Sequence, residues 1–199
     1  MSLSHRNGFT LAELLISLAI LGEIATFTIP KIIGAQQNGQ NNAIAKETVG
    51  SVAAAYQLYS ISNTVTATTS MSDLISYLNY AKIDTSSIVD SEQGGTSVDC
   101  ADPSLQCLRL HNGAILWHGK TNVDFGGTTD LNAIYFLVDP DARYSGSTTG
   151  NGKSIKFYLY RNGRVATWAS ISTGTVTHEW GNYYVTNADA TRDPPWFSW

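Results

Sequence analysis

The long apolar stretch at residues 9–33 constrains this chain more than any other feature. Its charged side chains are Glu13, Glu23 and Lys31. As a helix rising 1.5 Å per residue, the stretch would be about 37 Å long, and the hydrocarbon core of a bilayer is about 30 Å thick. We therefore expect this segment to span a membrane.

The residues before the apolar stretch set its expected orientation. The leader, MSLSHRNG, is polar and carries Arg6 as its fixed positive charge. Positive flanks stay on the cytoplasmic side, so the bulk of the chain is expected outside the cytoplasm. A removed signal peptide has its small-residue cleavage site after the apolar core. Here Gly8 precedes the core, so cleavage after Gly8 would leave the helix on the mature chain.

Glu13 is a carboxylate within the apolar stretch. Near the centre of a helix in lipid, such a group costs roughly 2.5–3.5 kcal/mol on insertion scales. If Phe9 became the N-terminus, its amine would lie one helical turn from Glu13, and the amine of a neighbouring subunit could neutralise Glu13 equally well. In the alternative, the helix is a simple anchor and Glu13 is protonated near the lipid headgroups.

The sequence GFTLAE at residues 8–13 resembles the cleavage and methylation motif of type IV prepilins and type II secretion pseudopilins. The resemblance continues with Gly22 and Pro30, at the glycine and proline positions that soften the helix in that family. It implies that a membrane prepilin peptidase cuts between Gly8 and Phe9 and that Phe9 becomes N-methylated.

The same resemblance assigns a role to Glu13 and exposes one departure. It implies that Glu13 pairs with the Phe9 amine of an adjacent subunit during assembly. Glu23 stands where the family usually has an apolar residue. Tight helix packing then requires a partner for the Glu23 carboxylate, either Lys31 or a group on a neighbouring chain.

The apolar pattern continues beyond Pro30, so we expect one long, bent helix over residues 9–60. Proline removes a backbone hydrogen bond, which predicts a kink or a locally melted turn at Pro30. The first half would lie in the membrane or a filament core, and the second half would pack on a globular head. Helical spacing supports the second half through Ile44, Thr48, Val52, Ala55, Tyr56 and Tyr59.

The remaining chain predicts an α+β head. Ser70 and Asp73 are spaced as a capping pair, which predicts a short helix over residues 71–80. Residues 85–102 are polar and are expected to be irregular. Two Asn-Gly turns, at 112–113 and 162–163, favour hairpins. The expected strands cover residues 105–110, 114–117, 131–138, 155–160, 164–168 and 176–185.

The resulting architecture is a long N-terminal helix packed on a small antiparallel β-sheet, which is also the fold that the pilin resemblance implies. We divide the chain into a leader at 1–8, a transmembrane or filament-core helix at 9–33, and a periplasmic or extracellular head at 34–199. The head includes the second half of the long helix. The aromatic tail at 192–199 is expected to pack within its own subunit.

Cys100 and Cys107 enclose six residues. In an extracytoplasmic domain a disulfide is the natural interpretation, and chain-entropy reasoning assigns this short loop roughly 2.5 kcal/mol. The alternatives are free thiols or half of a metal site. Many type IV pilins have a cysteine pair that closes a C-terminal loop, whereas the pair here is central.

A weaker candidate site follows the strand predicted at 131–138. Asp139, Asp141 and Asn151 could supply the oxygen ligands that calcium prefers. In some major pseudopilins a neighbouring loop binds calcium, and the segment loosely resembles that region. Asp-Pro and Gly-Ser sequences are also ordinary turn chemistry, which is the alternative. No other cofactor is expected.

The sequence does not predict an enzyme. It contains no nucleophile elbow, no phosphate-binding loop and no zinc-protease motif. His111 and His118 are expected at the surface or in turns. The net charge of -4 argues against nucleic-acid binding, which relies on basic patches.

These patterns predict a structural subunit of a type IV pilus-like filament or a type II secretion pseudopilus. Its partners would be other pilins or pseudopilins, the prepilin peptidase and the inner-membrane assembly platform. It would begin in the bacterial inner membrane as a single-pass protein and end in a periplasmic pseudopilus or a surface pilus. The alternative is a membrane-anchored extracytoplasmic domain that binds or catalyses, with the helix as a tether.

Overall fold

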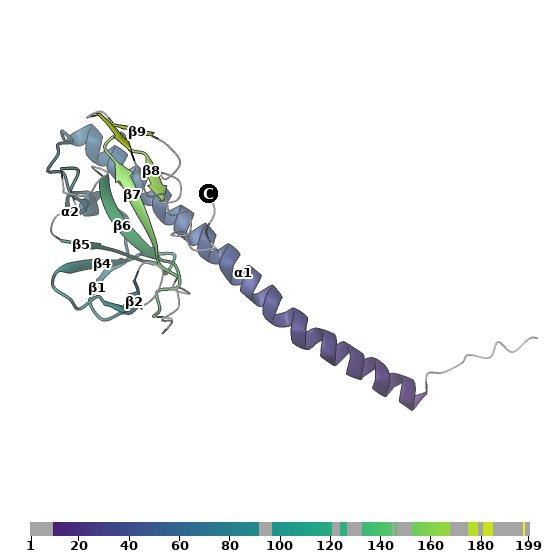
Figure 1. Ribbon diagram of the computed structural model, residues 1–199. Coiled ribbons are helices and arrows are strands. Elements are labelled where there is room, and N and C mark those ends of the chain that lie inside the picture. The colour runs from purple at the N-terminus through teal and green to yellow at the C-terminus, as the bar shows by residue number, and fades with distance from the viewer. Residues whose placement is uncertain are drawn as a thin grey trace, which may run out of the picture. The chain divides into compact units, whose positions relative to one another are not determined.

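A long helix and a six-stranded antiparallel sheet make up most of the described chain (Figure 1). The computed structural model describes residues 10–91, 97–120, 124–126, 133–144, 146, 153–167, 175–178, 181–184 and 197. The predicted cleavage site, Gly8 and Phe9, lies outside the described residues. The chain divides into two compact units, Met1–Gly39 and Gln40–Trp199.

Helix α1, Leu11–Ser62, contains 52 residues and confirms the long helix expected over residues 9–60. Pro30 lies inside it, and the helical backbone continues on both sides of the proline. Of the two outcomes expected at Pro30, a kink or a locally melted turn, the unbroken helix excludes the melted turn. The loss of one hydrogen bond at a proline is tolerated because the bonds before and after it still hold the helix.

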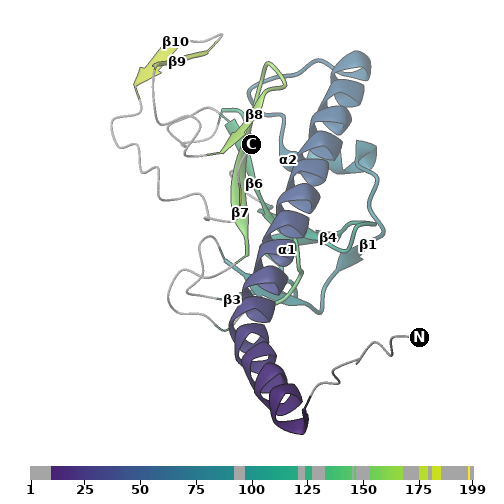
Figure 2. The same cartoon turned by 90° about the vertical axis from the view of Figure 1, so that its right-hand side faces the viewer.

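The second half of α1 forms part of the head. Its buried residues recur every three or four positions and so share one face: Asn41, Ala45, Thr48, Val49, Val52, Ala55 and Tyr56. This face packs against buried sheet residues that include Leu116, Phe136 and Phe157. Figure 2 shows the helix crossing one face of the sheet. The expected helix-on-sheet layout is confirmed.

The six-stranded sheet has the order β1-β4-β5-β6-β7-β8, and each neighbouring pair is antiparallel. Asn-Gly turns close the β4–β5 and β7–β8 hairpins, with Gly113 at φ 91° and Gly163 at φ 82°. These φ values suit glycine, which lacks a Cβ. The strands are β1 Lys82–Asp84, β4 Leu105–Arg109, β5 Ile115–Gly119, β6 Ala133–Asp139, β7 Ile155–Tyr160 and β8 Val165–Thr167.

Two short strands occupy the segment that we expected to be irregular. Strands β2, Ile88–Asp90, and β3, Ser97–Asp99, form an antiparallel hairpin. At three residues each, they are too short to carry a clear alternating pattern. Contacts that are remote in sequence fix them, since Asp90 donates its backbone N–H to the side chain of Asp139.

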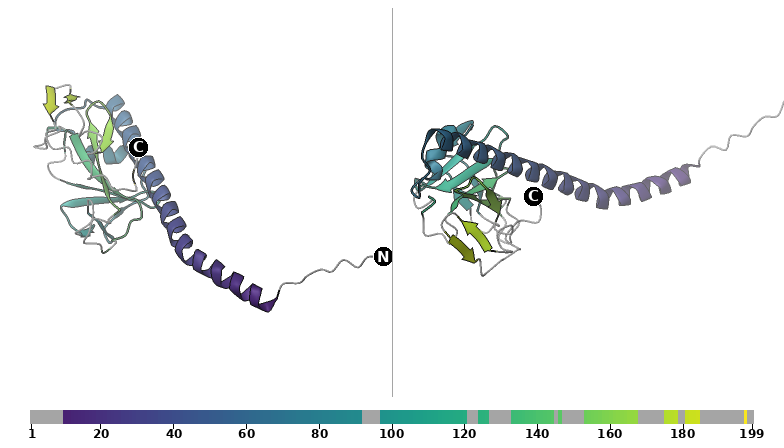
Figure 3. Two further views of the ribbon diagram at one scale, coloured as in Figure 1. Left: turned by 45° about the vertical axis from the view of Figure 1, so that its right-hand side comes forward. Right: turned by 90° about the horizontal axis from the view of Figure 1, so that it is seen from above.

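Two other elements differ in extent from the sequence prediction. The helix expected over residues 71–80 consists of α2, Met71–Leu74, and the 3-10 turn η1, Ile75–Tyr77. The single strand expected over residues 176–185 is instead a hairpin of β9, Thr175–His178, and β10, Gly181–Tyr184. Figure 3 draws this hairpin in yellow, separate from the six-stranded sheet.

Candidate functional site

The N-terminus of α1 is closed by reciprocal bonds between Thr10 and Glu13. The Thr10 backbone N–H and its hydroxyl both donate to Oε2 of Glu13, each at 2.8 Å. The Glu13 N–H donates in return to Oγ1 of Thr10 at 3.3 Å. This arrangement is a capping box, which satisfies backbone donors that a helix start leaves unpaired.

Sequence reasoning missed this cap, although the Thr-x-x-Glu spacing of Thr10 and Glu13 carries its signal. The cap uses one oxygen of the Glu13 carboxylate, Oε2. Because a carboxylate accepts several hydrogen bonds, the cap leaves Oε1 available for a further donor. The geometry is thus compatible with an additional cation at Glu13.

The first half of α1 presents apolar side chains outward. By length and composition, α1 is the one described helix that could cross a membrane. Its large apolar side chains are roughly half or more exposed. They are Leu11, Leu14, Leu15, Ile16, Leu18, Ile20, Leu21, Ile24, Phe27, Ile29, Ile32 and Ile33. An apolar surface of this extent requires lipid or protein to cover it.

The hydroxyl groups in this apolar segment are satisfied by the helix itself. Ser17 donates to the carbonyl of Glu13 at 2.7 Å. Thr26 donates to Gly22 at 2.8 Å, and Thr28 donates to the carbonyl four residues before it at 2.9 Å. These i−4 bonds remove the need for outside partners, which makes the hydroxyls compatible with lipid or a filament core.

Glu23 and Lys31 differ from the hydroxyl residues. Both side chains are exposed on α1. Within the described ranges, neither side chain has a hydrogen bond or an ion pair. A charged group in an apolar environment normally has a partner, because burying it alone is costly. The structure therefore does not supply the Lys31 partner considered for Glu23 within the same chain.

The candidate calcium residues do not form a shared set in the described chain. Asp139 is fully buried, and its two carboxylate oxygens accept the backbone N–H groups of Asp90, at 3.1 Å, and Ala142, at 3.0 Å. Asp141 is exposed and accepts the N–H of Arg143. Asn151 lies outside the described residues. No group of three or more acidic, histidine or cysteine residues suited to a metal occurs within the described part.

Asp139 instead organises the chain around it. Burial and the neighbouring Asp141 carboxyl raise the pKa of Asp139 to about 8. Asp90, also fully buried, accepts the Lys153 N–H at 3.0 Å on its carboxylate. Its carbonyl accepts the Ser154 hydroxyl at 2.6 Å. The sequence carries no local signal for Asp90, because its hydrogen-bond partners are about 50 or more residues away.

The disulfide between Cys100 and Cys107 is present, with the Cα atoms 5.7 Å apart. It confirms the predicted pairing. The sulfurs pack with Val89 and Ile115 in a small apolar cluster on the face of the sheet opposite α1. The disulfide therefore ties the loop before β4 to the sheet.

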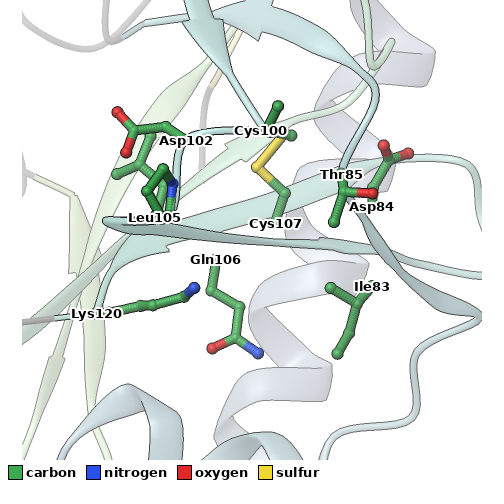
Figure 4. Close-up of a pocket in the computed structure, with 11 residues that line it drawn as sticks. Ile83, Asp84, Thr85, Cys100, Asp102, Leu105, Gln106, Cys107 and Lys120 are labelled. Carbon is green, nitrogen blue, oxygen red and sulfur yellow. A yellow bond between two sulfur atoms is a disulfide. The ribbon is translucent and has the colours of Figure 1, made fainter.

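A pocket of about 220 Å³ lies beside this disulfide, and Figure 4 shows the bridge in its wall. Of its acidic lining residues, Asp84 accepts Nε of Arg109 at 2.9 Å. Burial alone would raise the pKa of Asp84. Hydrogen bonds from the Ser86 N–H and the Arg109 side chain have a larger effect and hold this pKa below its usual range. Asp102 accepts the backbone N–H and the hydroxyl of Ser104. The acids are thus engaged in local structure.

His118 is fully buried, which corrects the expectation that it lies at the surface or in a turn. It belongs to β5, and its Nδ1 is 2.6 Å from the carbonyl oxygen of Gly119. Its Nε2 has no hydrogen-bond partner in the described part of the chain. Burial lowers the pKa of His118. His111 is exposed, as expected, and lies 3.2 Å from Asn79.

The C-terminal tail is described at Phe197 alone. This side chain is buried, and its ring meets Phe157 edge to face at 5.4 Å between centroids. The contact agrees with packing of the tail within its own subunit. The other tail aromatics lie outside the described residues.

Comparison with known families found one match. Residues 3–25 match the prokaryotic N-terminal methylation motif, which is the hallmark of prepilin-type sequences in type IV pilins and pseudopilins. The matched range contains Gly8, Phe9, Glu13, Gly22 and Glu23. Comparisons with curated proteins and with solved structures found no match.

Proposed function

We propose that this type IV pilin-like prepilin is a structural subunit that polymerises through its N-terminal helix. The filament would be a type IV pilus or the short pseudopilus of a type II secretion system. The observation that carries the proposal is the methylation motif, whose matched residues 3–25 overlap the start of a helix with exposed apolar side chains. We also propose that the role of this protein is structural and not enzymatic.

The apolar surface of the first half of α1 would meet two environments in turn. Before assembly, lipid covers the first half of α1, with the leader cytoplasmic and the head outside the inner membrane. After assembly, the helices of neighbouring subunits cover it. The satisfied hydroxyls of Ser17, Thr26 and Thr28 suit both environments.

We further propose the maturation steps that the motif implies. Prepilin peptidase cuts between Gly8 and Phe9, and Phe9 becomes N-methylated. The Phe9 amine of one subunit then pairs with Glu13 of its neighbour at the assembly platform. The cap leaves Oε1 of Glu13 without a bond to Thr10, and this supports the proposal.

N-terminal peptide mass spectrometry tests this proposal on protein recovered from the native membrane and from the sheared surface fraction. We expect a mature chain that starts at N-methylated Phe9. Its presence in the sheared fraction identifies a surface pilus, and its restriction to the cell envelope identifies a pseudopilus. A chain that starts at Met1, or one cut beyond Ile33, would contradict the filament role and favour the anchored binding or enzymatic domain.

A further inference from the structure

Glu23 and Lys31 are the two charged side chains in residues 14–33. Both are exposed, and within the described residues neither side chain has a bonding partner. We propose that Glu23 of one chain forms an ion pair with Lys31 of a second copy of this chain when their apolar segments pack in parallel. This inference rests on the proposed polymerising function. It names the register of a second contact in the filament, between copies other than the pair that Phe9 and Glu13 join at an offset of about 6 Å.

The two residues are too far apart on one helix to pair with each other. They are eight residues apart, which corresponds to a rise of about 12 Å and a rotation of about 80°. Side chains on a helix meet at spacings of three or four residues. Since α1 is continuous from Leu11 to Ser62, no break shortens this separation.

A second copy of the chain can supply the partner that each charged side chain cannot reach on its own helix. If two parallel copies are offset by about 12 Å along the helix axis, Glu23 of one lies level with Lys31 of the other. Water is excluded between apolar helices, so the attraction between opposite charges is stronger there than at a wet surface. No atom lies within 4 Å of the position of a Cβ on Gly22, so the surface beside Glu23 is open to a neighbouring helix.

Glu13 is a poorer partner for Lys31. The two residues are 18 positions apart, which requires an offset of about 27 Å. The described apolar segment, residues 11–33, is about 34 Å long, so this offset would leave only about 7 Å of overlap. An offset of about 12 Å leaves about 22 Å of overlap. Pairing Lys31 with Glu23 therefore keeps most of the apolar surface of the two helices in contact.

A charge-swap experiment tests the pair in the full-length chain in its native host. We expect Glu23→Lys and Lys31→Glu each to reduce the yield of assembled filament at least about tenfold, because each leaves two like charges facing each other. The double variant, E23K with K31E, should recover most of the wild-type yield. Lys46→Glu, a reversal at an exposed position in the second half of α1, should assemble normally.

The outcomes separate this inference from the proposed function. If wild type assembles and the double variant does not recover, the pairing between two copies is wrong and the structural role stands. Single reversals that assemble normally would also overturn the pairing. If wild type is present in the membrane but never polymerises, both the proposed function and the pairing fail.

Cysteine cross-linking covers the case in which the charge variants fail to insert. One tagged copy carries Glu23→Cys and a differently tagged copy carries Lys31→Cys, and the membranes are oxidised. We expect a dimer that contains both tags. The control places Leu15→Cys against Lys31→Cys, an offset of about 24 Å, and should give little dimer. Equal dimer from both pairs, or none from the first, would overturn the proposed register.

Discussion

The backbone N–H of Asp90 donates a 3.1 Å hydrogen bond to Oδ2 of Asp139. Both residues are fully buried. The bond joins the β2–β3 hairpin to the end of β6, two segments that are far apart in the sequence. Asp139 is therefore a structural residue that fixes one part of the head against another.

The raised pKa of Asp139 predicts a pH-dependent stability of the head. The folded state keeps this proton up to a pH of about 8, whereas the unfolded chain releases it near its ordinary pKa of 3.8. The folded state thus binds more protons between these values, and its free energy of unfolding falls as pH rises, by as much as about 1.4 kcal/mol per pH unit.

Asp139→Asn should flatten this dependence, as measured by denaturant unfolding of the detergent-solubilised chain between pH 6.5 and 8. This window avoids His118, whose lowered pKa makes stability fall as pH drops below about 6.5. Asp141→Asn should flatten it partly, because it removes the neighbouring carboxyl. A wild-type stability that rises through this window would refute the assignment.

Glu13 has a capping role and a proposed charge-pairing role, which two substitutions separate. Glu13→Gln keeps an oxygen acceptor for the Thr10 cap but removes the negative charge. We expect it to insert in the membrane and to lose filament assembly. Thr10→Ala removes the cap side chain, at a cost of about 1 kcal/mol, and keeps the charge, so it should assemble.

Filament yield in the sheared or envelope fraction, together with the N-terminal mass of each variant, measures both effects. Normal assembly of Glu13→Gln, combined with failure of Thr10→Ala, would show that Glu13 acts only as a cap.

The Cys100–Cys107 disulfide is expected to stabilise the head. Because the bridge closes a short loop, replacing both cysteines by serine should lower the free energy of unfolding by about 2.5 kcal/mol. Urea unfolding of wild type with and without reductant gives the comparison. Reductant should lower the midpoint of wild type and leave that of the double variant unchanged. An unchanged wild-type midpoint would exclude a stabilising role.

The two Asn-Gly turns offer a matched pair of glycine substitutions. Both glycines have positive φ, so alanine at either position is strained by about 1–2 kcal/mol. A Cβ on Gly163 would also lie 3.2 Å from a ring carbon of Tyr56, whereas nothing lies within 4 Å of one on Gly113. Gly163→Ala should therefore destabilise the head more than Gly113→Ala in thermal unfolding. Equal losses would contradict the close packing of the second turn on α1.

The local chemistry of the sequence was sufficient to predict the main elements. The run of apolar residues and the helical periodicity predicted α1, and the Asn-Gly turns with alternating apolar residues predicted the β4–β5 and β7–β8 hairpins. The Cys100–Cys107 pairing and the methylation motif were also predictable from the sequence. In each case the signal lies within a few residues of the feature that it predicts.

Tertiary structure decided the features that depend on distant partners. The three-residue strands β2 and β3 are too short to show a periodicity, and bonds of Asp90 to Asp139, Lys153 and Ser154 help to fix them. Whether His118 is buried depends on what covers its strand, and sequence spacing does not report this. Spacing determines which residues share a face of a helix or strand, whereas burial and hydrogen-bond partners are set by the packing of elements remote in sequence.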